Sequence, residues 1–252
     1  MTGIVHKAYS RMNGSDTVVL CVHGIQGSPV QFDWLMERVP ACVDLLCVLL
    51  PGHGKTSREF AKTGWREWIG YIDRVYRDLA ARYKRVIYIG HSMGCLLGII
   101  AAGRGAAWRS MILLACPLRL HLTFRYLRNN LKAAFQPGSA DPYVSAIVKS
   151  NSISSDHPFG FLMYLKPYMG LLKLVCIARK AVKQIDIPMI VFQSEKDEIV
   201  SAGSLKYFMC EPNAVTCILP DSGHSFYSAE SKKTVVQNML GVLEKCRGIE
   251  KV

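Results

Sequence analysis

Six short apolar runs, rich in β-branched residues and ended by turn residues, recur along the chain. They span residues 17–24, 43–54, 85–90, 110–116, 187–193 and 214–220. Because apolar residues follow one another in these runs, and do not alternate with polar ones, the runs predict strands that are covered on both faces. Such strands are typical of a parallel sheet.

Amphipathic segments between these runs predict helices. Residues 28–39 begin with Ser28 as an N-cap and Pro29 in the first turn. Residues 63–83 place apolar side chains at three- and four-residue spacing, namely Trp65, Trp68, Ile72, Val75, Tyr76 and Leu79. Two more helices are expected after Ser92 and over 234–246. This alternation predicts an α/β fold with a mostly parallel, doubly wound sheet.

Composition indicates a cellular compartment and excludes some classes of protein. The chain has 252 residues, half of them hydrophobic, and lacks linkers and repeats, which favours a single domain. Its polar amino terminus does not resemble a signal peptide, and Lys166, Pro167 and Lys173 interrupt the most apolar later segment, so we expect no membrane span. Nine cysteines, mostly in apolar runs and without a CxxC pair, indicate a cytoplasmic protein without a metal site.

The residues GHSMG, 90–94, lie between the strand predicted over 85–90 and a helix expected from Met93. They fit the G-x-S-x-G motif, in which a serine occupies a strained turn between a strand and a helix. The small residues Gly90 and Gly94 allow this turn without clashes. The turn lifts Oγ of Ser92 above the edge of the sheet, so Ser92 is the candidate nucleophile.

A serine nucleophile needs a base and a carboxylate that orients the base. His224 follows the last predicted strand, and of the seven histidines it alone has the right place in chain order. Asp197 follows the strand predicted over 187–193, and we favour it as the carboxylate. Its rivals are Glu195, Glu198 and Asp221.

The loop HGIQGSP, which follows the first predicted strand, is the candidate for a second backbone donor. Its Ile25 amide and the Met93 amide would form an oxyanion hole for the acyl oxygen. The alternative is an ordinary turn between a strand and a helix. We expect His23 and His53, which both lie in HG loops, to hydrogen-bond local backbone without a catalytic role.

Together these motifs resemble those of the α/β-hydrolase superfamily, more narrowly small bacterial carboxylesterases and monoacylglycerol lipases. The resemblance rests on HGIQGSP, PGHGKT, TGWREW, GHSMG, the KDEIV loop and SGH, between residues 22 and 224. It implies an α/β-hydrolase fold with eight strands or slightly fewer, no cofactor, and a catalytic triad of Ser92, Asp197 and His224.

Two positions depart from the family pattern. Cys95 follows GHSMG where relatives often have glycine, in a place that faces helix packing. Leu49 and Leu50 precede PGHG where an acidic residue is often found, which leaves the anchoring of that loop open.

The resemblance implies a serine hydrolase that cleaves carboxylic esters through an acyl-enzyme. Relatives that displace halide or open epoxides carry aspartate in place of Ser92, so the serine indicates acyl transfer to water. The expected substrate is a small molecule, a monoacylglycerol or another short or medium acyl ester. One alternative is a carbon–carbon hydrolase or lyase of the menaquinone-pathway type, which usually has a basic residue near the nucleophile. The other is a binding protein without turnover, usually marked by a damaged triad.

Residues 117–185 contain no convincing strand, and the resemblance implies a mainly helical cap there, inserted after the strand at 110–116, with residues 1–116 and 186–252 as the core. We expect its apolar side chains, such as Phe124 and Phe135, to form an acyl pocket while its charges face water. Ten basic residues against two acidic ones give it most of the net charge of +12. These charges either make weak contact with an anionic membrane surface or form an ordinary solvated face. No motif for nucleic acid accompanies them.

Overall fold

A single twisted sheet organises the chain. The computed structural model describes residues 5–154 and 163–246, in which seven strands are ordered β1-β3-β2-β4-β5-β6-β7. The strands are β1 (Tyr9–Arg11), β2 (Thr17–Val22), β3 (Asp44–Val48), β4 (Arg85–His91), β5 (Ser110–Leu114), β6 (Met189–Ser194) and β7 (Ala214–Leu219). β1 runs antiparallel to β3, whereas the other neighbours are parallel. The mostly parallel, doubly wound sheet predicted from the sequence is therefore confirmed.

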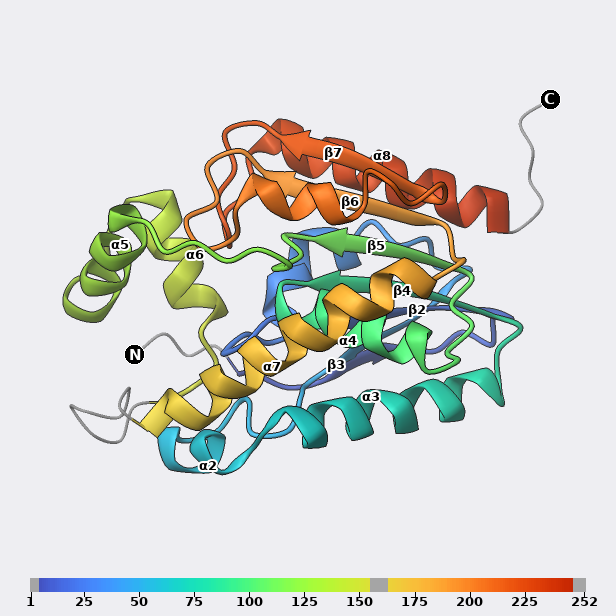
Figure 1. Cartoon of the computed structure of the whole chain (residues 1–252), viewed down its shortest axis with the longest axis horizontal. Coiled ribbons are helices and arrows are strands. Elements are labelled where there is room, and N and C mark those ends of the chain that lie inside the picture. The colour runs from blue at the N-terminus through green and yellow to red at the C-terminus, as the bar shows by residue number, and fades with distance from the viewer. Residues whose placement is uncertain (1–4, 155–162, 247–252) are drawn as a thin grey trace.

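Helices cover both faces of the sheet (Figure 1). The α-helices are α1 (Asp33–Met36), α2 (Ser57–Lys62), α3 (Trp65–Ala80), α4 (Met93–Gly103), α5 (Phe124–Phe135), α6 (Pro142–Ser150), α7 (Leu165–Ala181) and α8 (Ala229–Cys246). Short 3-10 helices are η1 (Pro29–Phe32), η3 (Val182–Gln184) and η4 (Ala202–Tyr207). Side chains of α3, α4 and α7 form one buried cluster with the sheet, and those of α1 and α8 form a second cluster on the other face.

The two elements that flank Ser92, β4 and α4, are among the deeply buried ones. Residues 86–91 of β4 and 93–101 of α4 are all buried. A helix that is apolar on every side requires cover on every side. Helices α3 and α7 supply that cover for α4, together with the sheet itself. The turn between β4 and α4 is therefore held in the rigid centre of the molecule.

The segment between β5 and β6 has two parts. Helices α5 and α6 stand beyond the carboxyl ends of the strands, at the left of Figure 1, whereas α7 crosses back over the sheet. Leu174 and Ala178 of α7 are fully buried in the cluster that contains α4. We therefore place α7 in the layer that covers the sheet; the division of 117–185 from the core as one cap stays a prediction.

Four elements differ from the sequence-based expectation. Strand β1 was not predicted, because it is mostly exposed and its sequence has no apolar run like those of the other strands. Strand β7 was expected to be buried on both faces, but Val215 is 64% exposed because β7 is the edge of the sheet. The helix expected over 28–39 is reduced to η1 and the single turn α1. Helix α2, which was not predicted, begins with a capping box between Thr56 and Glu59.

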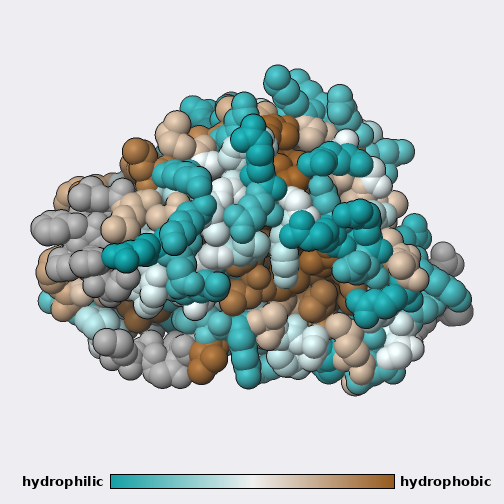
Figure 2. Space-filling view, turned by 90° about the horizontal axis from the view of Figure 1, so that it is seen from below, coloured by the Kyte–Doolittle hydropathy of each residue, from teal (hydrophilic) through white to brown (hydrophobic). Residues whose placement is uncertain are grey.

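The surface on the side of α2 and α3 carries both hydrophobic and hydrophilic side chains. Figure 2 shows hydrophobic surface mainly in the middle of this side, with hydrophilic side chains around it. Among the described residues, no helix is both long enough and apolar enough to cross a bilayer.

We predict opposite effects on stability for two glycine substitutions. In Gly94→Ala, the new Cβ would lie 2.0 Å from the carbonyl oxygen of Val22, a backbone atom that cannot rotate away. We expect the free energy of unfolding to fall by about 3 kcal/mol or more. In Gly241→Ala, on α8, the Cβ meets nothing within 4 Å, and the same free energy should rise by about 0.5–1 kcal/mol. Urea unfolding followed by circular dichroism measures both, and a mild Gly94→Ala variant would contradict the close approach.

Candidate active site

Ser92 occupies a strained turn between β4 and α4. Its φ of 51° and ψ of −119° lie in a region of backbone conformation that residues other than glycine rarely adopt. The Ser92 amide donates to the carbonyl oxygen of Leu114 at 2.9 Å, and the Ser92 carbonyl accepts from the Cys95 amide at 2.9 Å. A Cβ at Gly90 would lie 2.8 Å from the amide nitrogen of Cys95, so that glycine is required by close approach. These contacts fix the serine at the carboxyl end of the sheet.

Ser92, His224 and Asp197 form a continuous hydrogen-bonded chain. Nε2 of His224 lies 3.0 Å from Oγ of Ser92. Nδ1 of His224 lies 3.2 and 3.1 Å from the two carboxylate oxygens of Asp197. All three residues are buried. The structure thus brings together the three side chains that the sequence analysis selected, in an arrangement suited to moving a proton from serine to histidine.

The Asp197 carboxylate is held by its own loop. Its Oδ1 accepts hydrogen bonds from the amides of Ile199 and Val200, at 2.9 and 2.8 Å. Its Oδ2 accepts from Nε2 of Gln193, at the end of β6, at 3.2 Å. Burial raises the pKa of Asp197, but His224 and these amides together lower it below its ordinary value. The carboxylate is therefore charged at neutral pH and can orient His224.

His224 differs from the other buried histidines because it has a charged partner. Burial lowers its pKa, but Asp197, and then Glu198, raise it above its ordinary value overall. His91, next to the serine, points elsewhere: its Nε2 lies 2.9 Å from the carbonyl oxygen of His224. Burial and the neighbouring His224 lower the pKa of His91 to about 3. Only His224 is placed to exchange a proton with Ser92.

The rival carboxylates have other contacts. Glu198 is buried, and its Oε2 accepts from the backbone amide of His224 at 3.1 Å. The same oxygen lies 3.6 Å from the Arg125 guanidinium of α5. Glu195 and Asp221 are exposed, and the carboxylate of Asp221 pairs with Lys196. Glu198 thus supports the loop of His224, a role that sequence analysis missed because the two residues meet only in the fold.

The two amides expected to form an oxyanion hole lie on either side of Ser92. Met93 is the first residue of α4, and an amide in the first helical turn has no acceptor within its own helix. Ile25 lies in the turn after β2, and in the described part of the chain no acceptor takes its amide. Ile25 and Ser92 line the same pocket. The oxyanion hole of the Ile25 and Met93 amides stays a prediction.

Two neutral histidines hold the loops behind this site. Nε2 of His23 accepts from the Leu50 amide at 3.0 Å, and Nε2 of His53 accepts from the Gln26 amide at 3.1 Å. Burial lowers the pKa of His53 to about 4 and that of His23 well below its ordinary value. Both histidines hydrogen-bond local backbone, as expected. With the indole of Trp68, which donates to the Pro51 carbonyl at 3.0 Å, they anchor the PGHG loop without an acidic residue.

The pocket above Ser92 is small, and its wall mixes polar and apolar side chains. Its volume is about 110 Å³. Helices α5, α6 and α7, with the turn after α6, contribute Tyr126, Asn130, Ile147, Ser150, Asn151 and Tyr168 to its wall. The hydroxyl of Tyr168 donates to Oε1 of Gln26 at 3.2 Å, which ties α7 to the loop of Ile25.

Of the cap aromatics expected to form an acyl pocket, Tyr126 lines the pocket above Ser92, whereas Phe159 and Phe161 lie outside the described residues. Phe124 and Phe135 are each 81% exposed and do not line the pocket. The reason is the orientation of α5, whose polar residues Tyr126 and Asn130 face the site. Periodicity identifies an apolar side of a helix, but it does not say what that side faces.

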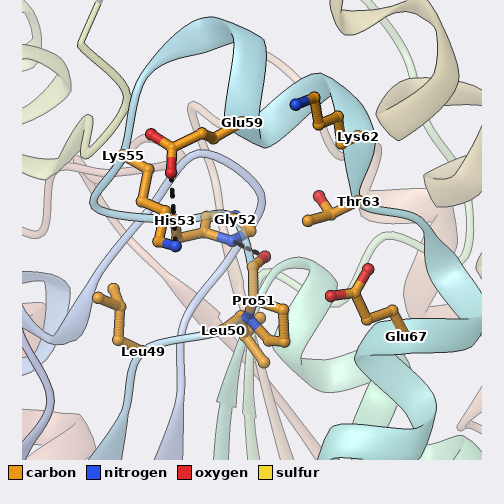
Figure 3. A pocket seen from close by; sticks show the side chains of 10 residues that line it. All are labelled: Leu49, Leu50, Pro51, Gly52, His53, Lys55, Glu59, Lys62, Thr63 and Glu67. Atoms are coloured by element: carbon orange, nitrogen blue, oxygen red, sulfur yellow. Dashed lines mark hydrogen bonds and ion pairs between the residues drawn. The ribbon is translucent and has the colours of Figure 1, made fainter.

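A larger hollow lies on the far side of the PGHG loop (Figure 3). Its volume is about 470 Å³, and its wall includes Lys55, Glu59, Lys62 and Glu67 around the loop backbone. Lys55 and Glu59 form an ion pair at 3.5 Å across its rim. The wall has no nucleophile and base in contact, so the smaller pocket above Ser92 is the candidate active site. Among the described residues, no group of histidine, cysteine and acidic side chains could hold a metal ion.

Comparison with known proteins identifies the family. The profile of the Alpha/beta hydrolase family matches residues 19–237, and the chain belongs to this family. Three solved structures share its fold. A structure of the metagenome-derived lipolytic enzymes LipS and LipT has a TM-score of 0.73 at 19% identity, covering 96% of this chain and 98% of that one. A monoacylglycerol lipase from Paleococcus ferrophilus has a TM-score of 0.65 at 15% identity, and the match covers 93% of this chain and 98% of that one. A meta-cleavage product hydrolase from Pseudomonas fluorescens has a TM-score of 0.69 at 15% identity, and the match covers 95% of this chain and 94% of that one.

Among curated proteins, 90 residues of the chain are 27% identical to the dihydrolipoyllysine-residue acetyltransferase component of the acetoin cleaving system of Cupriavidus necator. The match covers 36% of this chain and 24% of that protein. The chain thus spans about a quarter of this curated relative. Together with the family match, the structural neighbours support a hydrolytic enzyme.

We predict a pH profile governed by His224. Only neutral His224 accepts the serine proton, so the rate at which a fluorophosphonate probe labels Ser92 should rise with pH, with a midpoint above 6.5. Asp197→Asn removes the charge that raises the pKa of His224, so the midpoint should move to lower pH. The labelling rate should also fall by roughly 10⁴.

Glu195→Gln is the matched control, because Glu195 lies in the same loop but is exposed. Its labelling rate and midpoint should equal those of the unchanged protein. A midpoint that does not move in Asp197→Asn would show that Asp197 does not set the pKa of His224.

Proposed function

We propose that this protein is a serine hydrolase that cleaves uncharged carboxylic esters through an acyl-enzyme on Ser92. The observation that carries the proposal is the chain of hydrogen bonds from Oγ of Ser92 through His224 to the buried carboxylate of Asp197. A serine hydroxyl becomes a nucleophile when a positioned base takes its proton. Lipolytic enzymes among the structural neighbours agree with this reaction class.

The reaction follows from the positions of these groups. Oγ of Ser92 attacks the ester carbonyl carbon while its proton passes to Nε2 of His224. The carbonyl oxygen becomes negative and receives hydrogen bonds from the Ile25 and Met93 amides. The ester C–O bond then breaks, and His224 returns the proton to the leaving alcohol. Water, activated by the same histidine, cleaves the acyl-enzyme and releases the carboxylic acid.

The pocket supports short acyl groups. Its volume of about 110 Å³ is small beside the roughly 300–1,000 Å³ that is typical of ligand pockets. The pocket wall has polar side chains such as Asn130, Ser150 and Asn151, which suit a short chain or one with polar substituents better than a long alkyl chain. We therefore propose acetyl to butyryl esters as the best substrates.

A carbon–carbon hydrolase is the second candidate, favoured by the similarity to a meta-cleavage product hydrolase. A carboxylated substrate would need a cation in the pocket. Among the described residues, no lysine or arginine lines the pocket, whereas the carboxyl group of Glu198 does. This charge distribution supports an uncharged ester over a carboxylated diketone.

Buried thiols without a disulfide, such as those of Cys21 and Cys95, support a reducing compartment, and we propose the cytoplasm.

We predict that a fluorophosphonate probe labels the protein once, at Ser92. Ser92→Ala should abolish labelling and leave only residual ester hydrolysis. Mass spectrometry of the intact protein and its peptides identifies the labelled residue. Ser222→Ala is a control, because Ser222 is also buried near His224 but its hydroxyl donates to the carbonyl of Pro220. Labelling of any serine other than Ser92 would refute the proposed nucleophile.

We also predict a steep preference for short esters. With p-nitrophenyl esters from acetyl to dodecanoyl, kcat/KM should be highest for two to four carbons. It should fall by about tenfold or more at eight carbons, because a long chain does not fit the pocket without moving α5 or α6. Turnover of a meta-cleavage diketone with no turnover of any ester would favour the second candidate instead.

A further inference from the structure

Helix α5 exposes an apolar stripe to solvent. Phe124 and Phe135 are 81% exposed, and Leu127 and Leu131, which lie between them, are 55% and 51% exposed. Intervals of three, four and four residues place these side chains on one side of the helix. At 1.5 Å per residue the stripe is about 16 Å long, with an aromatic ring at each end.

The inward side of the same helix is polar. Tyr126 and Asn130 line the pocket above Ser92, and Asn129 is 1% exposed. A surface helix of a globular protein normally buries its apolar side and exposes its polar side, so α5 has the reverse arrangement. A large exposed apolar patch on such a domain marks an interaction surface or a liability for aggregation.

The charges beside the stripe indicate what it contacts. Arg128 lies four residues after Phe124 and Lys132 lies eight residues after it, so both flank the same edge of the stripe. Arg128 is exposed and Lys132 is half-buried. Helix α5 contains no acidic residue at all. A surface that fits this helix must be apolar in its interior and anionic at its boundary.

We propose that α5 docks on an anionic lipid bilayer, with its apolar stripe among the acyl chains at the headgroup boundary and Arg128 and Lys132 beside lipid phosphates. Apolar and aromatic residues on one side, with basic residues beside them, are typical of helices that lie in this interface. A second copy of the chain fits less well, because two α5 helices would bring their basic residues together without acidic partners. The docking does not require Ser92 chemistry, but it would hold the pocket next to the bilayer.

The test is flotation of the full chain with vesicles of phosphatidylcholine alone or with phosphatidylserine added. The unchanged protein should float with the mixed vesicles, and the bound fraction should fall as salt rises. Phe124→Ser/Phe135→Ser should weaken the partition coefficient by about tenfold or more. Arg128→Glu/Lys132→Glu should weaken it on the mixed vesicles only.

Two controls separate docking from general stickiness. Met209→Ser removes a side chain that is 70% exposed outside α5, and Lys180→Glu/Lys183→Glu reverses two exposed charges at the far end of α7. Both control variants should float like the unchanged protein. Ser92→Ala should float equally well, so a failure of the proposed chemistry does not affect this test. Fluorophosphonate labelling of Ser92 and circular dichroism verify that the α5 variants are folded.

Three results would overturn the proposal. The first is no flotation of the unchanged protein with mixed vesicles. The second is an equal loss of binding in the Lys180 and Lys183 variant, which would indicate unspecific attraction. The third is a dimer in sedimentation that dissociates in the phenylalanine variant, which would show that a second copy covers the stripe.

Discussion

The strained backbone of Ser92 is the constraint on which the rest of the structure depends. A residue at φ 51° and ψ −119° costs about 1–3 kcal/mol relative to relaxed backbone, and it persists only where its surroundings leave no alternative. Here the Ser92 amide is bound to Leu114 of β5, and an added Cβ at Gly94 would meet the Val22 carbonyl of β2. Strands β2, β4 and β5 are neighbours in the sheet, so their pairing fixes the turn. The burial of residues 86–91 in β4 and 93–101 in α4 supplies the stability that offsets the strain.

Electrostatics then distinguishes one histidine from the others. His23, His53 and His91 are as deeply buried as His224, and burial keeps them neutral while they hydrogen-bond to backbone. His224 has the same burial but faces Asp197, whose charge is stabilised by two loop amides and Gln193. The contrast shows that proximity to Ser92 does not suffice, because His91 is adjacent in sequence and points to the carbonyl oxygen of His224. The charged partner raises the pKa of His224, which suits the role of base that we propose for it.

Sequence analysis predicted those residues of the site whose positions follow from the order of strands along the chain. In a parallel sheet, residues just after successive strands meet at one edge, so Ser92, Asp197 and His224 could be selected from their positions after β4, β6 and β7. Contacts between the cap and the core follow no such rule. The bonds from Ser152 to the carbonyls of Gln26 and Gly27 join residues more than a hundred positions apart, and no local pattern announces them. The exposed β1 and the short α2 escaped prediction because they contain too few buried residues to produce a pattern.

Helix α5 is the clearest case in which the expected environment was wrong, because Phe124 and Phe135 were expected to form an acyl pocket. Its apolar spacing is real, but the small pocket above Ser92 takes up the inward side through Tyr126 and Asn130. The apolar side is then left outward, where water is a poor partner for two phenylalanine rings. A helix that has few apolar contacts with the core also has little local stability of its own. Cover on its outer side would therefore stabilise the same helix that forms the wall of the pocket, so the state of that surface and the shape of the pocket are linked through α5.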